Sequence, residues 1–331
     1  MTNERLRFLA LLLASIAADL SLMATAQLRP DHYAGVCPDL ESIVRGAVSR
    51  SMAHSPVAAP ATLRLFFHDC AVRGCDASIL LTRPDGGDEW RSPDGLTLKP
   101  EGFDTVMHAK DAVDGDPRCR HKVSCADVLA LAARDAVYLS GGPNYEVELG
   151  RYDGTASTES SVTVPHGDFD LDRLNAFFSG LGLSQTDMIA LSGAHTIGAA
   201  ACNFFEYRVA VGNETAGDPA AAGMDAGFAA RLRGACAGAT NNRSGGFAFL
   251  DGATPTRFDN AYYENLRRGR GVLGSDQALH DDARSRGKVE LYAGDEDAFF
   301  DDFAAAMMRL GRVGVRMAGN GEIRRDCRFP N

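Results

Sequence analysis

The sequence predicts a mainly α-helical protein. Apolar residues recur at the spacing of amphipathic helices, capping residues precede several of these runs, and alternating strand-like patterns are scarce. Beyond the N-terminal leader, no linker, internal repeat or low-complexity tract divides the 331 residues. We therefore expect one compact unit, large enough to form two lobes.

Four helical segments and one short strand can be predicted in order. Asp39 can cap the first helix, in which apolar residues at 43, 44, 47 and 48 share a face. The second and third helices begin with capping-box patterns, Ser124 with Asp127 and Ser184 with Asp187. The fourth is an Ala- and Met-rich run at 297–315, and the best strand candidate is 145–150.

The first 26 residues have the order of features of a secretory signal peptide. Arg5 and Arg7 precede an apolar run too short to span a membrane, and small residues at 24–26 provide a cleavage site. An ordinary amphipathic N-terminal helix is the alternative. We predict a secreted chain of residues 27–331 with no membrane anchor and with Gln27 able to form pyroglutamate.

Composition narrows the function classes further. The formal net charge of −10 disfavours binding to nucleic acid, because an acidic chain is repelled by phosphates. Eight cysteines, an even number, suit full pairing in an oxidising compartment, although only Cys70 and Cys75 are close enough to suggest a local bridge. Zinc is the alternative, but no C-x-x-C pair is present. Glycosylation sequons begin at Asn213 and Asn242.

The segment RLFFHDCAVRGCDAS at 64–78 concentrates chemically active side chains. Arg64 and His68 are one turn apart on a predicted helix, among apolar neighbours. A neutral imidazole there can take a proton while a fixed guanidinium stabilises the charge that develops. An isolated pair of this kind would more often be a surface pair.

The residues that follow favour a cation site. Asp69, Asp76 and Ser78 offer side-chain oxygens, and Val72 and Gly74 offer carbonyls in the loop between the two close cysteines. Calcium accepts such a mixed oxygen shell with irregular geometry. Solvated or capping aspartates are the alternative.

A second histidine-bearing helix is predicted at MIALSGAHTIGAAAC, where His195 lies among small residues. Gly193, Ala194 and Gly198 leave room for a flat group to approach. Two helices, one with Arg64 and His68 and one with His195, can hold a planar cofactor between them. A core histidine is the alternative, and covalent c-type haem is excluded because C-x-x-C-H is absent.

These motifs resemble those of the secreted plant (class III) haem peroxidases. RLFFHDCAVRGCDASILL is similar to the family's distal signature and DMIALSGAHTIG to its proximal one. VSCADVLALAARDAV, GGPNYEVELGRYDG, TPTRFDNAYYENL and GVLGSDQAL follow in the family's order. The resemblance covers residues 27–327 and implies the plant-type peroxidase fold, with two helical lobes around haem b, four disulfides and minimal β structure.

The resemblance implies roles for the active-site residues. His68 corresponds to the distal base that moves a proton between the oxygens of hydrogen peroxide, and Arg64 to its charge-stabilising partner. Phe67 corresponds to the residue that shields the iron from bulky donors. His195 corresponds to the axial iron ligand, with Asp276 accepting a hydrogen bond from its other nitrogen.

The resemblance also implies two calcium sites, a substrate contact and the disulfide pairing. Pro165 corresponds to a proline that lines the donor channel. The first calcium site would use Asp69, Val72, Gly74, Asp76 and Ser78, with Glu89 beyond a water; the second would use Thr196, Asp251, Thr254, Arg257 (backbone only) and Asp259. The implied disulfides are Cys37–Cys119, Cys70–Cys75, Cys125–Cys327 and Cys202–Cys236.

Three departures from the family pattern stand near these positions. Gly95 replaces an asparagine that bonds the distal histidine, so we predict a weaker base at His68 unless Asp94 substitutes, and a faster peroxide step in Gly95→Asn. Ala71 replaces a common phenylalanine, which we interpret as a packing change. His166 and Gly167 replace a more usual proline-rich run.

The predicted function is reduction of hydrogen peroxide coupled to one-electron oxidation of two phenolic donors. The radical products would cross-link lignin, suberin or wall proteins. A secreted haem- and calcium-binding wall glycoprotein with little catalysis is the alternative. We expect a monomer. We also expect it in the apoplast rather than the vacuole, because the four residues after Cys327 are too few for a long C-terminal sorting tail.

Overall fold

The computed structural model of the protein describes residues 28–209, 223–237 and 246–331, and it confirms the mainly helical class. The predicted leader and both sequon asparagines, Asn213 and Asn242, lie outside these ranges. No helix within them is long and apolar enough to cross a membrane.

Four helices of the N-terminal half pack against one another. The central one is α5, in which residues 125–137 are all buried, because its many alanines let neighbours approach from every side. These four helices are α2 (Leu40–His54), α3 (Ala58–Val72), α4 (Pro100–Gly115) and α5 (Cys125–Leu139).

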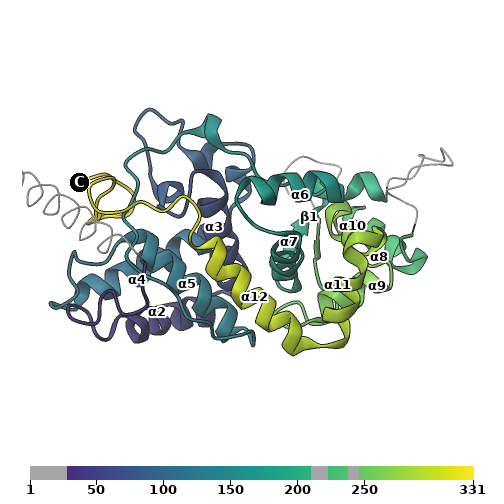
Figure 1. The fold of residues 1–331 in the computed structure, drawn as a ribbon. Helices are drawn as coiled ribbons and strands as arrows, with labels where there is room; N and C mark the ends of the chain where they lie inside the picture. Colours follow the sequence, from purple (N-terminus) through teal and green to yellow (C-terminus); the bar gives the residue numbers. More distant parts are fainter. Residues whose placement is uncertain (1–27, 210–222, 238–245) are drawn as a thin grey trace, which may run out of the picture.

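A second group of shorter helices forms the other half of the molecule, beside a two-stranded antiparallel sheet (Figure 1). Its elements are α6 (Leu171–Gly180), α7 (Gln185–Ser192), β1 (Ala199–Ala201), α8 (Ala226–Cys236), β2 (Phe247–Phe249), α9 (Ala261–Arg267), α10 (Gly274–Asp281) and α11 (Ala283–Gly294).

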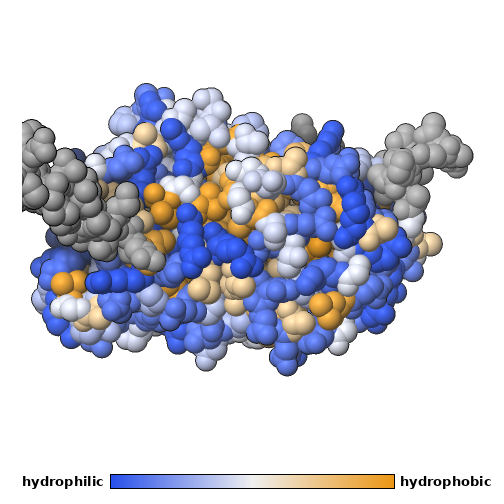
Figure 2. Space-filling model, in the orientation of Figure 1, coloured by the Kyte–Doolittle hydropathy of each residue, from blue (hydrophilic) through white to orange (hydrophobic). Residues whose placement is uncertain are grey.

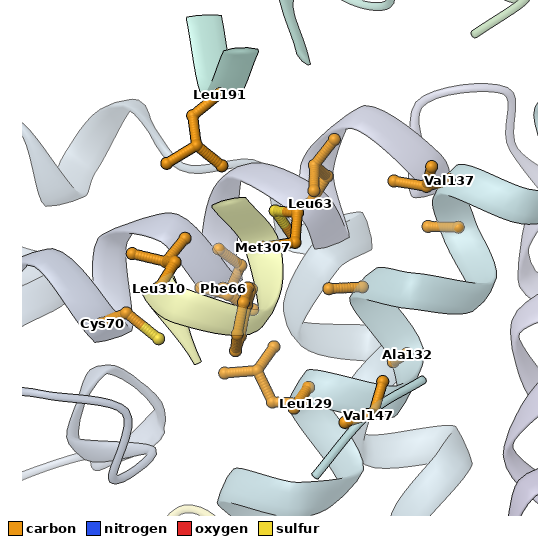
Figure 3. Close-up of a cluster of buried hydrophobic side chains, with 14 of the residues drawn as sticks. Leu63, Phe66, Cys70, Leu129, Ala132, Val137, Val147, Leu191, Met307 and Leu310 are labelled. Atoms are coloured by element: carbon orange, nitrogen blue, oxygen red, sulfur yellow. The ribbon is translucent and has the colours of Figure 1, made fainter. Parts of the chain in front are cut away.

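The last helix, α12 (Glu296–Leu310), runs between the two groups (Figure 1). It packs on α7 and α11, and its Met307 and Leu310 join a cluster that includes Phe66 of α3 and Leu191 of α7 (Figure 3). Buried apolar side chains therefore connect α3, α5, α7 and α12 at the centre of the molecule.

Four disulfides have the pairing that the resemblance implied. Cys125–Cys327 fastens the C-terminal tail to the start of α5, and the tail also pairs Arg328 O with the Thr82 N–H. The chain thus crosses to the second group of helices, returns through α12 and ends against the first group (Figure 1).

Three local predictions need correction. Asp39 precedes α2 but makes no cap bond, because its carboxylate pairs with Arg118. The Ser124 hydroxyl does cap α5, but the Asp127 carboxylate accepts from the Tyr33 hydroxyl instead of completing the box. Residues 145–150 form only a bridge to the segment at Arg29, whereas the capping box of Ser184 and Asp187 is complete.

Candidate active site

Helix α3 presents Arg64 and His68 one turn apart, as predicted. The Arg64 guanidinium donates to the Thr97 carbonyl at 3.0 Å and to the Thr97 hydroxyl at 2.6 Å. Thr97 ends a short 3₁₀ helix, η3 (Gly95–Thr97). Desolvation by the surrounding protein lowers the pKa of Arg64, and the negative charge of Asp94 partly opposes this effect. The side chain is nevertheless exposed to solvent, and it is held in place by Thr97.

His68 is nearly fully buried on the same helix, with 2 % of its surface exposed. Its Nδ1 has no hydrogen-bond partner among the described residues, so Asp94 does not replace the missing asparagine as a partner of His68. Burial, followed by the charge of Arg64, lowers the pKa of His68 to about 3. The imidazole is therefore neutral near neutral pH and able to accept a proton.

Gly95 is required where it stands. A Cβ on Gly95 would lie 2.4 Å from the Glu89 carbonyl oxygen and 2.6 Å from backbone atoms of Trp90. Any side chain at position 95 must therefore displace the loop that holds Thr97 against Arg64. The faster peroxide step expected for Gly95→Asn stays a prediction, and this displacement would act against it.

His195 does not lie on a helix continuing from 188, which corrects the sequence prediction. Helix α7 ends at Ser192, and His195 belongs to the 3₁₀ turn η5 (Gly193–Thr196) before β1. A Cβ on Gly193 would lie 2.4 Å from the Phe299 ring and from the Tyr263 hydroxyl. Glycine is needed here because α7 turns directly against two packed aromatic rings.

The Asp276 carboxylate fixes the orientation of His195. His195 Nδ1 lies 2.8 Å from Asp276 Oδ1. The same carboxylate accepts from the Tyr262 hydroxyl at 2.9 Å and from the Leu273 N–H at 3.1 Å. Because the carboxylate accepts, His195 Nδ1 donates, and the lone pair on Nε2 remains available for a metal.

Tyr262 is a site residue that the sequence did not identify. Two tyrosines are adjacent in TPTRFDNAYYENL, and both are buried. Tyr262 points to Asp276, whereas Tyr263 donates to the Ile189 carbonyl. Only the packing of α9 against its neighbours decides which hydroxyl reaches the site.

The segments carrying the two imidazoles meet across the middle of the molecule. A Cβ on Gly198 would lie 3.1 Å from Pro60 at the start of α3, and the Phe67 ring lies 6.0 Å from the Phe178 ring of α6. Figure 2 shows apolar side chains exposed in the middle of this face, in the region of α3 and α7. Although this region is central, 39 % of the His195 side chain is exposed. We call this apolar region, with Arg64 and His68 on one side and His195 on the other, the recess. Such a region beside a partly exposed imidazole fits a flat, apolar, metal-bearing group.

The first predicted cation site gathers buried carboxylates from the last turn of α3 and from the loop after it. Asp69 accepts from the N–H groups of Ala77 and Ile79, and Ser78 donates its hydroxyl to Glu89 Oε2 at 3.3 Å. Glu89 Oε1 is buried and has no hydrogen-bond partner within the described part of the chain. Burial raises the pKa of Glu89 to about 7, and burial followed by the charge of Asp76 raises that of Asp69 well above its usual range.

The second predicted cation site follows His195. The Thr254 hydroxyl lies 2.8 Å from Asp251 Oδ2 and 3.0 Å from Asp259 Oδ1, and the Thr196 hydroxyl lies 3.3 Å from the same Asp259 oxygen. Arg257 turns its side chain to Asp259 and donates its backbone N–H to the Thr254 carbonyl. The structure thus brings together the side chains predicted from distant segments.

Neither cation site is built from acidic and imidazole ligands alone. Across the described ranges, no three His, Cys, Asp or Glu side chains converge as they would at such a site. Each predicted set instead combines two main carboxylates with hydroxyl and carbonyl oxygens, which suits a hard cation such as calcium.

The segment after Pro165 bridges the two halves of the recess. Gly167 O accepts from the Ser275 N–H at 2.9 Å, next to Asp276, and from the Tyr207 hydroxyl at 3.1 Å. At the other side, His166 Nε2 lies 3.7 Å from Asp94 Oδ2. Half-buried Pro165 therefore stands at a rim that touches both walls.

Comparison with known proteins agrees with this geometry. The sequence model of the family described as Peroxidase matches residues 44–295. The chain belongs to the peroxidase family. It is similar to Peroxidase 16 of Arabidopsis thaliana, with 51 % identity over 91 % of this chain and 92 % of the relative. Peroxidase 45 of the same plant is 50 % identical over 93 % of each chain, and Peroxidase 51 is 47 % identical over 96 % of each.

The resemblance to plant haem peroxidases is therefore confirmed, and the protein is a haem peroxidase. The helical architecture and the four disulfides agree with that family.

Proposed function

We propose that this peroxidase reduces hydrogen peroxide between His68 and Arg64 on one wall and a haem b held by His195 on the other, and oxidises phenols one electron at a time. One observation carries the proposal: a buried neutral imidazole on α3 and a second, partly exposed imidazole fixed by a carboxylate lie on segments that meet where Gly198 approaches Pro60. Bound haem iron would supply the two electrons that peroxide takes up and recover them from the donors.

His68 moves the proton. Its neutral ring accepts a proton from one oxygen of hydrogen peroxide and delivers it to the other, so that water leaves. Arg64, oriented by its two bonds to Thr97, stabilises the negative charge that develops on the departing oxygen. His195 would bind the iron through Nε2, and Asp276 would increase the basicity of its ring.

The ring of Phe67 limits access to the space beside His68. It is half-buried, packs near Phe178 of α6 and lies 6.4 Å from the His68 ring. We propose that it excludes phenols from this space while hydrogen peroxide passes, and that donors bind at the rim near Pro165.

Replacement of His68 by alanine tests the proton-transfer role. We expect kcat/KM for hydrogen peroxide to fall by roughly 10²- to 10⁴-fold while the haem Soret band is retained, because His195 and Asp276 are untouched. His108→Ala, an exposed histidine on α4, is the matched control and should keep the wild-type value. Equal activity of His68→Ala and the control would overturn the assignment.

The alternative of a non-catalytic wall protein is tested on the unmodified chain. We expect purified holoprotein to oxidise guaiacol far above the rate of free haemin. A normal Soret band without that excess would favour the binding protein.

We further propose that two calcium ions bind at the sites described above. The first would be held by Asp69, Asp76, Ser78 and the carbonyls of Val72 and Gly74, with Glu89 beyond a water. Its support is the cluster of buried carboxylates and the Glu89 oxygen that has no partner among the described residues, whose negative charge a divalent cation would offset.

The second calcium ion would be held by oxygens of Thr196, Asp251, Thr254 and Asp259 and by the Arg257 carbonyl. Thr196 follows the iron ligand directly, so this ion would couple to the position of His195.

Removal of calcium tests both sites. After treatment with a chelator, with metal analysis confirming loss of the ions, we expect a lower melting temperature, a shifted haem spectrum and lower activity. Unchanged spectra and rates in the calcium-free protein would contradict this part of the proposal.

We also propose a secreted, glycosylated monomer whose donors are small wall phenols. The support is the leader-like first 26 residues, the two sequons and four disulfides, which persist in oxidising compartments. Mass analysis of protein secreted by plant cells tests this: we expect Gln27 at the N-terminus, as pyroglutamate, and glycans at Asn213 and Asn242.

A further inference from the structure

We propose that Asp94 and His166 form a charge filter at the rim of the recess, which discriminates against phenols bearing a carboxylate and relaxes when His166 is protonated. The inference rests on the proposed function, because it concerns the choice among phenolic donors. Asp94 and His166 are positioning residues for the donor and take no part in proton transfer from peroxide.

The location of the pair follows from its neighbours. The Asp94 carboxylate is close enough to Arg64 to favour its charged form, and the turn that follows Asp94 holds Arg64 through Thr97. His166 lies 3.7 Å from Asp94 on the segment whose next residue is bonded to the N-terminus of α10. Asp94 lies beside Arg64 on the α3 side of the recess, and His166 lies on the segment that is bonded to α10 on the His195 side. The two side chains thus meet where these two sides are connected.

Both side chains are available to a donor at this rim. The side chain of His166 is 59 % exposed and that of Asp94 is 29 % exposed. The His166 ring also lies 5.5 Å from the Phe169 ring, so the rim offers an aromatic surface beside the carboxylate. A phenol can stack here with its polar substituent near Asp94.

The charges around His166 come from its own segment and from several packed elements. Asp168 and Asp170 are exposed acids on its own segment. The Arg173 guanidinium lies 5.5 Å from the centre of the Phe169 ring, which packs beside His166. Arg64 lies behind Asp94 and is held by Thr97, while the Tyr207 hydroxyl donates to Gly167. Asp94 is the acid that lies closest to His166 among these groups.

The charge of the pair depends on pH. With a neutral imidazole the pair carries the negative charge of Asp94 and repels a carboxylate donor. With a protonated imidazole the pair is neutral, and the repulsion is lost.

Two donors with the same phenolic ring measure the filter. Ferulate carries a carboxylate, and coniferyl alcohol is neutral. Steady-state oxidation by the holoenzyme gives kcat/KM for each, and the ratio of the two values cancels effects on peroxide reduction. In wild type we expect the ferulate to coniferyl alcohol ratio to rise as pH falls from about 8 to about 5.

Three variants complete the experiment. Asp94→Asn should raise the ratio roughly three- to tenfold at the upper pH, as expected for one charge removed within several ångströms of another. His166→Gln should have the same low ferulate to coniferyl alcohol ratio as wild type at the upper pH. Its ratio should not rise as the pH falls. Asp104→Asn removes the same charge from an exposed position on α4 and should leave the wild-type ratio.

The outcomes separate the two proposals. If neither donor is oxidised by the holoenzyme, the proposed function fails and the filter with it. If both are oxidised but Asp94→Asn matches Asp104→Asn, the filter alone is wrong. The filter is also wrong if His166→Gln retains the pH dependence of wild type.

Discussion

Tyr262 and His195 bind the same oxygen of Asp276, so the tyrosine moderates how strongly the carboxylate accepts from the imidazole. In Tyr262→Phe, Asp276 Oδ1 loses one donor and should accept more strongly from His195 Nδ1. The ring then becomes more electron-rich, and we expect the reduction potential of the bound iron to fall. A spectroelectrochemical titration of the holoprotein measures it.

Tyr263→Phe is the matched control for this prediction. Its hydroxyl donates to the Ile189 carbonyl, so the potential should stay at the wild-type value while stability falls by about 1 kcal/mol. A potential that rises or stays constant in Tyr262→Phe would contradict the moderating role.

The pH dependence of the peroxide step follows from the environment of His68. Burial and Arg64 lower its pKa to about 3, so the neutral base is present from alkaline pH down to about pH 4. Protonation, which would remove the base, begins only below that range. Stopped-flow rates of the reaction with hydrogen peroxide should therefore show no inflection near pH 6.5, the usual value for histidine. An inflection there would show that His68 is protonated as if exposed.

Gly95→Ala tests whether the close approach of the loop matters. The new Cβ would clash with Glu89 and Trp90 backbone atoms, so we expect a loss of about 1–3 kcal/mol in the free energy of unfolding. Chemical denaturation measures the loss. Gly115→Ala is the control, because a Cβ there meets no atom within 4 Å, and that variant should be neutral or slightly stabilised.

At the scale of single elements, the start of α7, the helix that leads to His195, is fully capped. The Ser184 hydroxyl accepts from the Asp187 N–H at 3.1 Å, Asp187 accepts in return from the Ser184 N–H at 2.9 Å, and Arg309 of α12 donates to the other Asp187 oxygen. Ser184→Ala should therefore cost about 1 kcal/mol of stability, measured by denaturation.

Asp39→Ala is the contrasting helix-end variant. Asp39 makes no cap bond and only an exposed pair with Arg118, so the loss should stay below about 0.5 kcal/mol. Losses of the same size in the two variants would show that the capping box of α7 adds nothing.

The elements differ in how far sequence could predict them. The face of α3 was predictable because an i,i+4 pair on a long apolar run leaves one geometry. The end of α7 was not, because GAHTIGAA has no helix-stopping proline and its small residues suit a helix as well as a turn. Contact of Gly193 with the rings of α9 and α12 ends the helix, and those rings are distant in sequence.

For the whole molecule, the bridge between α5 and the C-terminal tail should matter most for stability. Cys125 and Cys327 are 202 residues apart, whereas Cys202 and Cys236 are 34 apart. In the loop-entropy description, removal of the long-range bridge should cost about 5 kcal/mol and of the shorter one about 4 kcal/mol.

Paired alanine variants of each disulfide, compared by denaturation under oxidising conditions, measure this difference. The Cys125–Cys327 variant should be the less stable by about 1–2 kcal/mol. The reverse order would indicate that the tail is held mainly by its other contacts, such as the bond from the Arg324 N–H to Asp153.

The helical class, the pairing of Arg64 with His68 and, through ordered motifs, the partners His195 and Asp276 can be read from the chain alone. These depend on local spacing or on long matching segments, which a linear chain displays directly. Four other features depend on packing: Tyr262 shares Asp276, Thr97 holds Arg64, Gly95 has no room for a side chain, and Asp94 meets His166. Each of these features is a contact between segments far apart in the chain or between backbones at a tight turn. Packing acts on the whole molecule at once, and it therefore selects among the local conformations that the sequence alone allows.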